Sequence, residues 1–149
     1  EKRDELTTEG GLDVCSAASA LEAAITRLHA ANIRVALFVD PDDAQIRCAA
    51  AVGADVVELH TGTYAEAVEE EQRLQELERL RQAAAGAQAL HLRVHAGHGI
   101  HYGNVAMVAA LQPVVELNIG HAIVSQAIYD GLAEAVGEMK RRMLAARGK

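Results

Sequence analysis

Four short apolar runs recur along the chain, and longer segments with helical periodicity separate them. Each run is bounded by glycine, proline or a polar residue: "VALFVD" (35–40), "DVVELHTG" (55–62), "LHLRVHAG" (90–97) and "PVVELNIG" (113–120). Runs of this length, rich in valine and leucine and enclosed by turn-forming residues, are typical of buried strands. We therefore predict four strands.

The segments around these runs show the apolar spacing of helices. We predict helices over residues 13–31, 41–54, 63–85, 104–111 and 132–146, with a short further segment at 121–129. Asp40 and Pro41 have the residue types of a helix cap and a first helical position, and Thr63 with Glu66 has the spacing of a capping box. Strict alternation of strands and helices indicates a parallel sheet with right-handed crossovers.

The predicted strands are apolar on one face and polar on the other. In "VVELH" (56–60), Val57 and Leu59 share one face, whereas Glu58 and His60 lie on the opposite one. The polar positions of the next two strands are Arg93, His95, Glu116 and Asn118. An open doubly wound sheet is buried under helices on both faces and is apolar on both, so the pattern favours a barrel with a partly polar interior.

Charges inside a barrel need partners, because an isolated buried charge is very costly. We expect Arg93 to pair with Glu58 or Glu116. At this point two interpretations stay open: the charged groups serve chemistry, or they only satisfy one another.

Length limits how much of a barrel is present. An eight-unit (β/α)8 TIM barrel needs about 250 residues, and this chain of 149 residues has four predicted strand–helix units and a leading helix. We therefore interpret residues 1–149 as the C-terminal half of a single α/β TIM-barrel domain whose N-terminal strands are absent. The first residue is Glu1 rather than methionine, which agrees with a chain that starts mid-protein.

Composition excludes several classes of partner. A net charge of −7 and an aromatic content of 3% argue against nucleic-acid binding. No apolar run is long enough to span a membrane, and the first ten residues lack the layout of a signal peptide. Cys15 and Cys48 lack metal-ligand spacing, so we expect two free thiols in a cytoplasmic protein.

Candidate chemistry lies in the turns after the last two strands, "AGHGIHYGN" (96–104) and "NIGHAIVS" (118–125). Glycines followed by a helix start bring backbone N–H groups close to an anion, which favours a phosphate. His98 is a candidate general acid–base group. His95 and His101 straddle the same turn and should fan apart from His98, so we expect no metal.

Four stretches together resemble the pyridoxine 5′-phosphate synthase family: "EKRDELTTEGGLDV" (1–14), "VELHTGTYA" (57–65), "AGHGIHYGNV" (96–105) and "ELNIGHAIVSQAI" (116–128). The resemblance covers essentially the whole chain. It implies a (β/α)8 barrel that assembles as an octamer and needs no cofactor. It also implies condensation of 1-deoxy-D-xylulose 5-phosphate with 3-amino-2-oxopropyl phosphate to pyridoxine 5′-phosphate, phosphate and water.

The resemblance implies roles for individual residues. Glu58 matches a glutamate that stabilises the transition state, and His98 matches the proton donor. The positions that match substrate-binding or phosphate-binding residues are Thr7, Gly99, Gly120 and His121. One departure is His95, where the family often has asparagine.

The family's first four strands have no counterpart in this sequence. With them are missing an Asn-x-Asp-His motif, a His-x-Arg segment and a glutamate, which the resemblance implies serve as bases and substrate ligands. We therefore expect a polypeptide of only 149 residues to be unable to complete the condensation alone. Two alternatives stay open: a non-catalytic phosphate-binding half-barrel that self-associates, and a metal-dependent hydrolase that uses the histidines.

Overall fold

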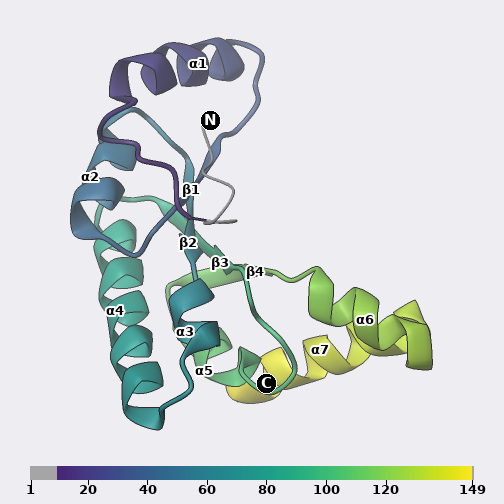
Figure 1. The fold of residues 1–149 in the computed structure, drawn as a ribbon. Helices are drawn as coiled ribbons and strands as arrows, with labels where there is room; N and C mark the ends of the chain where they lie inside the picture. Colours follow the sequence, from purple (N-terminus) through teal and green to yellow (C-terminus); the bar gives the residue numbers. More distant parts are fainter. Residues whose placement is uncertain (1–9, 149) are drawn as a thin grey trace.

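The computed structural model describes residues 10–148. Helices and strands follow one another along the chain as shown in Figure 1: α1 (Ala18–Ala30), β1 (Ala36–Val39), α2 (Asp43–Ala51), β2 (Val56–His60), α3 (Gly62–Glu66), α4 (Glu70–Ala89), β3 (Arg93–Gly97), α5 (Val105–Ala109), β4 (Val114–Asn118), α6 (His121–Asp130) and α7 (Leu132–Ala146). The four predicted strands are confirmed, and so is the last predicted helix.

The strands form one parallel sheet in the order β1-β2-β3-β4. The α/β class with a parallel sheet is therefore as predicted. Register places Phe38, Glu58, His95 and Glu116 in one row across the four strands. A register shift between Val94 and His95 interrupts the last pairing, so β4 is locally irregular.

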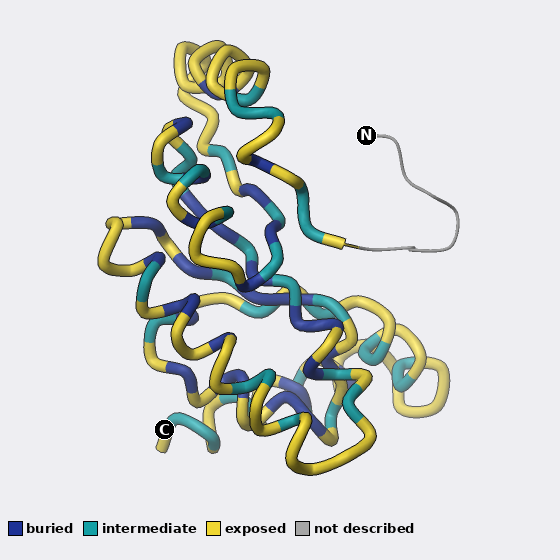
Figure 2. Tube along the Cα trace, turned by 60° about the vertical axis from the view of Figure 1, so that its left-hand side comes forward, coloured by how far each residue is buried: buried dark blue, intermediate teal, exposed yellow. Residues whose placement is uncertain are grey.

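Among residues 10–148, helices cover one face of the sheet, and no helix lies over the other, which we call the open face (Figure 1). Val57 and Leu59 of β2 are fully buried on the covered face, where α2, α4 and α5 pack against the strands. Glu58 and His60 point to the opposite face, as the alternation predicts, and are only partly buried. The two inner strands, β2 and β3, are mostly buried, whereas β4 is largely exposed and α6 has no buried residue (Figure 2).

The start of α2 corrects one prediction. Its cap is Asp42, whose carboxylate accepts a hydrogen bond from the Gln45 N–H. Asp40, the predicted cap, is engaged elsewhere: its Oδ1 atom accepts from the Gly11 N–H at 3.2 Å and lies 3.0 Å from His60 Nδ1. The carboxylate of Asp40 thus makes contacts with residues distant in sequence instead of capping α2.

The predicted helix over 63–85 is two helices, α3 and α4. The chain turns extended at Ala67 (φ −61°, ψ 116°), and α4 starts afresh at Glu70. The predicted capping box is wrong, because the Thr63 hydroxyl donates to Glu76 of α4 instead.

The expectation of two free thiols is also wrong, because Cys15 and Cys48 form a disulfide with their Cα atoms 5.3 Å apart. The segment before α1 lies against α2, where the Gln45 side chain accepts from the Val14 N–H at 2.8 Å. Cys15 and Cys48 are 33 residues apart in the sequence, and no local pattern indicates that they lie close together.

The expected partner of Glu116 is a further correction. Glu116 lies 3.5 Å from His95 Nδ1 and pairs with that imidazole rather than with the predicted Arg93.

Within the described part of the chain, no helix combines the length and apolar character needed to cross a membrane.

Candidate active site

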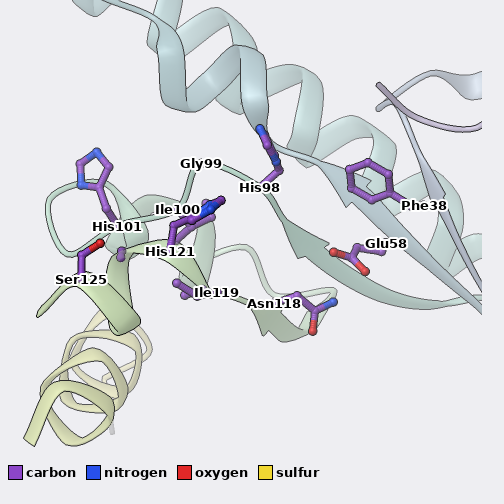
Figure 3. Close-up of a pocket in the computed structure, with 12 residues that line it drawn as sticks. Phe38, Glu58, His98, Gly99, Ile100, His101, Asn118, Ile119, His121 and Ser125 are labelled. Carbon is purple, nitrogen blue, oxygen red and sulfur yellow. The ribbon is translucent and has the colours of Figure 1, made fainter. Parts of the chain in front are cut away.

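A cavity of about 810 Å³ opens at the carboxyl ends of the strands. Strand side chains and the turns after β3 and β4 line it (Figure 3): Phe38, Glu58, His98, Gly99, Ile100, His101, Asn118, Ile119, Gly120, His121, Ala122 and Ser125. Carboxyl ends of parallel strands are where α/β folds bind ligands, because helix N-termini and adaptable loops meet there.

Glu58 reaches the cavity from β2 because β3 ends in a residue without a side chain. A Cβ atom at Gly97 would lie only 2.5 Å from Glu58 Oε1 and 3.0 Å from the Asn118 carbonyl oxygen. Gly97 therefore makes room for the carboxylate between two strands. Figure 3 shows Glu58 and Asn118 on the strand side of the cavity.

His98 follows directly after β3 and has a left-handed backbone, with φ of +86°. This conformation is uncommon for a residue with a side chain and persists only where the surroundings enforce it. Here the buried Thr61 hydroxyl lies 2.6 Å from the Gly97 carbonyl oxygen and 2.5 Å from that of His98. Thr61 thus fixes the turn that presents the imidazole to the cavity.

Three consecutive strand ends bring an acid and two imidazoles together. Asp40 follows β1, His60 ends β2 and His98 follows β3. The ring centres of His60 and His98 are 5.0 Å apart, and the ring of Phe38 packs edge-on against His60. His60 Nε2 is buried and has no hydrogen-bond partner among residues 10–148.

The opposite wall of the cavity is the start of α6. Gly120 is the N-cap residue and makes no side-chain cap, and His121 is the first helical residue. The first N–H groups of a helix lack partners within it, and the helix dipole adds partial positive charge there. His121 and Ser125, one turn apart, both line the cavity (Figure 3). This wall is suited to an anion such as a phosphate.

The structure therefore brings five of the six predicted site residues to one cavity: Glu58, His98, Gly99, Gly120 and His121. The sixth, Thr7, lies outside the described residues. Sequence reasoning missed Phe38, Asn118 and Ser125 as lining residues. Strand alternation already placed Asn118 on the open face, and the four-residue spacing from His121 was a usable signal for Ser125.

Two of the three histidines of the first turn lie at the cavity. His98 and His101 line the cavity, whereas His95 lies further down β3 beside Glu116. Over residues 10–148, no group of three or more histidine, cysteine, aspartate or glutamate side chains is arranged to hold a metal ion. What the cavity offers is three imidazoles, a carboxylate and a helix start, which are groups for proton transfer and anion binding.

Comparison with known proteins adds an independent observation. A family model described as "Pyridoxal phosphate biosynthesis protein PdxJ" matches residues 1–145. Three proteins named pyridoxine 5′-phosphate synthase, from Legionella pneumophila strains Corby, Lens and Paris, are each 52% identical to this chain over 147 residues. The match covers 99% of this chain and 59% of each relative, so the chain spans less than two thirds of their length.

A solved structure shares the fold. A chain in the crystal structure of the Amycolatopsis orientalis BexX/CysO complex superposes with a TM-score of 0.63 over 92% of this chain and 50% of its own length. The two sequences are 16% identical, so this likeness concerns the fold alone.

Proposed function

Because the chain belongs to the family of the pyridoxal phosphate biosynthesis protein PdxJ, we propose that it works as part of a pyridoxine 5′-phosphate synthase. The reaction condenses 1-deoxy-D-xylulose 5-phosphate with 3-amino-2-oxopropyl phosphate and releases phosphate and water. The observation that carries the proposal is the single cavity in which Glu58, His98 and the start of α6 meet.

His98 is the proton donor in this proposal. Imine formation and ring closure expel oxygen as water, and a departing oxygen leaves more readily when an acid protonates it. An imidazole changes charge near neutral pH, so it can both deliver and regain that proton. Its position after β3, held by Thr61, is suited to this transfer.

Glu58 and the glycine turns complete the assignment. The carboxylate of Glu58 stabilises positive charge that develops on nitrogen-bearing intermediates. Gly99 approaches substrate with its backbone, and Gly120 with His121 holds a phosphate at the start of α6. The structure gives these groups a common cavity, which is what such a division of roles requires.

We further propose that the complete protein is a (β/α)8 barrel. Among the described strands, β1 and β4 each pair along one side only, and the open face carries Glu58, His95 and Glu116. Further strands that close the barrel would pair with the outer edges of β1 and β4, and the open face of the sheet would then line the interior of the barrel. The chain spans 59% of the Legionella relatives, so we assign the full condensation to the whole protein and not to these 149 residues.

The remaining proposals concern the protein's surroundings. We propose a homo-octamer, which acts in the cytoplasm on small phosphorylated substrates and binds neither nucleic acid nor membrane.

A second candidate function is phosphate binding without catalysis, in a half-barrel that pairs with a second copy. The observation that favours it is the outer edge of β4, with which no described strand pairs and where Val115 is 55% exposed. Open parallel edges favour association. Size-exclusion mass of the purified chain tests this second candidate: it requires a dimer, and a stable monomer contradicts it.

The synthase proposal is tested with a chimera. This chain is joined to the part of the Legionella pneumophila relative that it does not match, and formation of pyridoxine 5′-phosphate is assayed. We expect turnover by the chimera and a loss of about 100-fold or more in the His98→Gln variant.

His91→Asn is the matched control, because His91 is exposed and does not line the cavity, and asparagine suits its φ of +62°. A folded chimera without turnover contradicts the proposal, and so does an unchanged rate in His98→Gln. Turnover by the unjoined chain contradicts the assignment to the whole protein.

A further inference from the structure

We propose that Asn118 and Glu58 together bind the amino ketone head of a substrate. The carboxamide of Asn118 donates to the ketone oxygen, and the carboxylate of Glu58 accepts from the ammonium group on the neighbouring carbon. The inference rests on the proposed function, in which 3-amino-2-oxopropyl phosphate is the substrate with such a head. It deepens that function by giving a role to Asn118, a residue that lines the cavity and that the proposal above leaves without one.

The first step is the gap that Gly97 leaves in the sheet. Register places His60, Gly97 and Asn118 side by side at the ends of β2, β3 and β4. Gly97 has no side chain, so this row is interrupted at its centre. A Cβ atom there would lie 2.5 Å from Glu58 Oε1 and 3.2 Å from Asn118 Cβ. The side chains of Glu58 and Asn118 therefore border one small space, from the two strands that flank β3.

The second step is that both side chains have unused hydrogen-bonding capacity. Among residues 10–148, neither the carboxylate of Glu58 nor the carboxamide of Asn118 has a hydrogen-bond or ion-pair partner. Both line the cavity of about 810 Å³, on its strand side (Figure 3). A molecule in the cavity can therefore bind both groups without displacing a bond between described residues.

Neighbouring side chains in the sheet have partners of their own. His95 lies beside Glu58 in the register, but its Nδ1 atom is 3.5 Å from Glu116 Oε1. His60 lies beside Gly97, and its Nδ1 atom is 3.0 Å from Asp40 Oδ1. Glu58 and Asn118 are thus the polar pair that this part of the sheet leaves to a ligand.

The third step is the chemistry that the two groups recognise. A carboxylate only accepts hydrogen bonds, whereas a carboxamide carries two N–H donors as well as an acceptor oxygen. Side by side, they are suited to a ligand that has a donor next to an acceptor. An ammonium group suits Glu58 better than a hydroxyl does, because hydrogen bonds between charged groups are the stronger ones. An amine one carbon away from a ketone meets both requirements.

The test is isothermal titration calorimetry of the full 149-residue chain with three phosphorylated ligands. These are 3-amino-2-oxopropyl phosphate, 3-aminopropyl phosphate, which lacks the ketone, and dihydroxyacetone phosphate, which has a hydroxyl in place of the amine. All three carry the same phosphate, so differences in affinity report on the head group. We expect the amino ketone to bind most tightly, because it alone satisfies both side chains.

Two variants should give complementary patterns. We expect Asn118→Ala to weaken binding of the two ketones by about fivefold, because the ketone oxygen loses its donor, and to leave 3-aminopropyl phosphate unchanged. We expect Glu58→Gln to weaken binding of the two amines by about tenfold or more, with little change for dihydroxyacetone phosphate. A defect in folding would instead weaken all three ligands alike.

Asn32→Gly is the matched control. It removes an exposed carboxamide that does not line the cavity, and glycine suits the φ of +58° at this position. We expect its affinities for the three ligands to equal those of the original chain.

Unchanged affinity of Asn118→Ala for the amino ketone overturns the inference, and so does an equal loss for all three ligands. Absence of saturable amino ketone binding by the original chain also overturns it. The titrations need no turnover, so they are separate from the chimera assay. An inactive chimera with the expected binding pattern contradicts the proposed function alone, and an active chimera without that pattern contradicts this inference alone.

Discussion

The hydroxyl oxygen of Thr61 lies 2.5 Å from the carbonyl oxygen of His98, across the ends of β2 and β3. The same hydroxyl lies 2.6 Å from the Gly97 carbonyl oxygen, which also accepts the Thr61 backbone N–H at 2.9 Å. A hydroxyl has one proton, so it serves one carbonyl at a time. Because Gly97 has a second donor, the His98 carbonyl depends more on Thr61.

Replacing this hydroxyl tests whether it holds the turn. We expect Thr61→Val to lower the free energy of unfolding by about 1–3 kcal/mol, because the partly buried carbonyl of His98 loses its donor. Thr61→Ser keeps the hydroxyl and should cost about 1 kcal/mol or less, mainly for one lost methyl group. Urea unfolding measures both, and equal losses in the two variants would show that the hydroxyl is not what matters.

The close approach of Glu58 to Gly97 gives a second prediction. We expect Gly97→Ala to destabilise the chain by about 1–3 kcal/mol, because the new methyl group meets Glu58 Oε1 and the backbone of β4. Gly120→Ala is the control, since a Cβ atom there has no neighbour within 4 Å. Thermal unfolding compares them, and a Gly97→Ala protein as stable as Gly120→Ala would contradict the described approach.

The lowered pKa of Asp55 leads us to predict that the free energy of unfolding depends on pH. A hydrogen bond from the Val35 N–H at 2.7 Å, and then one from His29 at 2.8 Å, hold the pKa of Asp55 below its usual value of 3.8. A lowered pKa in the folded state stabilises the protein above the unfolded pKa, and this contribution is lost as the pH falls through the folded pKa.

We therefore expect Asp55→Asn to be less stable than the original chain at pH 7. The difference should narrow as the pH falls below about 4. Urea unfolding across this range measures it. Asp43→Asn is the comparison, because Asp43 lies on the surface of α2 in an exposed pair with Arg47. A difference for Asp55→Asn that is constant with pH would contradict the interpretation.

The disulfide predicts a response to reductant. Closing a loop between Cys15 and Cys48, which are 33 residues apart, should stabilise the oxidised chain by about 3–4 kcal/mol. Urea unfolding with and without dithiothreitol measures the difference. The double variant Cys15→Ser with Cys48→Ser should be insensitive to the reductant, and an equally insensitive original chain would show that the bond does not form.

Period-two alternation was enough to predict which face of β2 and β4 carries the polar side chains, although not which of those side chains line the cavity. Glu58 and Asn118 were on the polar side of their strands in the sequence, and the structure keeps them there. The glycine–histidine pairs at 97–98 and 120–121 were visible as turns for the same reason, since glycine next to a strand end is a local signal.

Long-range contacts were not predictable in this way. Asp40 has the residue type of a helix cap, yet its carboxylate binds Gly11 and His60, which are distant in sequence. The disulfide likewise depends on how the segment before α1 meets α2. Local pattern does not encode such partners, because they depend on the packing of whole elements.

Binding of 1-deoxy-D-xylulose 5-phosphate to this chain, measured by isothermal titration calorimetry, tests most directly that the cavity is a phosphate-substrate site. We predict saturable binding that non-phosphorylated 1-deoxy-D-xylulose lacks. Gly120→Asp should lose at least about tenfold in affinity, because a carboxylate then repels the phosphate at the start of α6. The neutral isostere Gly120→Asn should retain most of it. Equal affinity in these two variants, or equal binding of the non-phosphorylated sugar, would contradict the account.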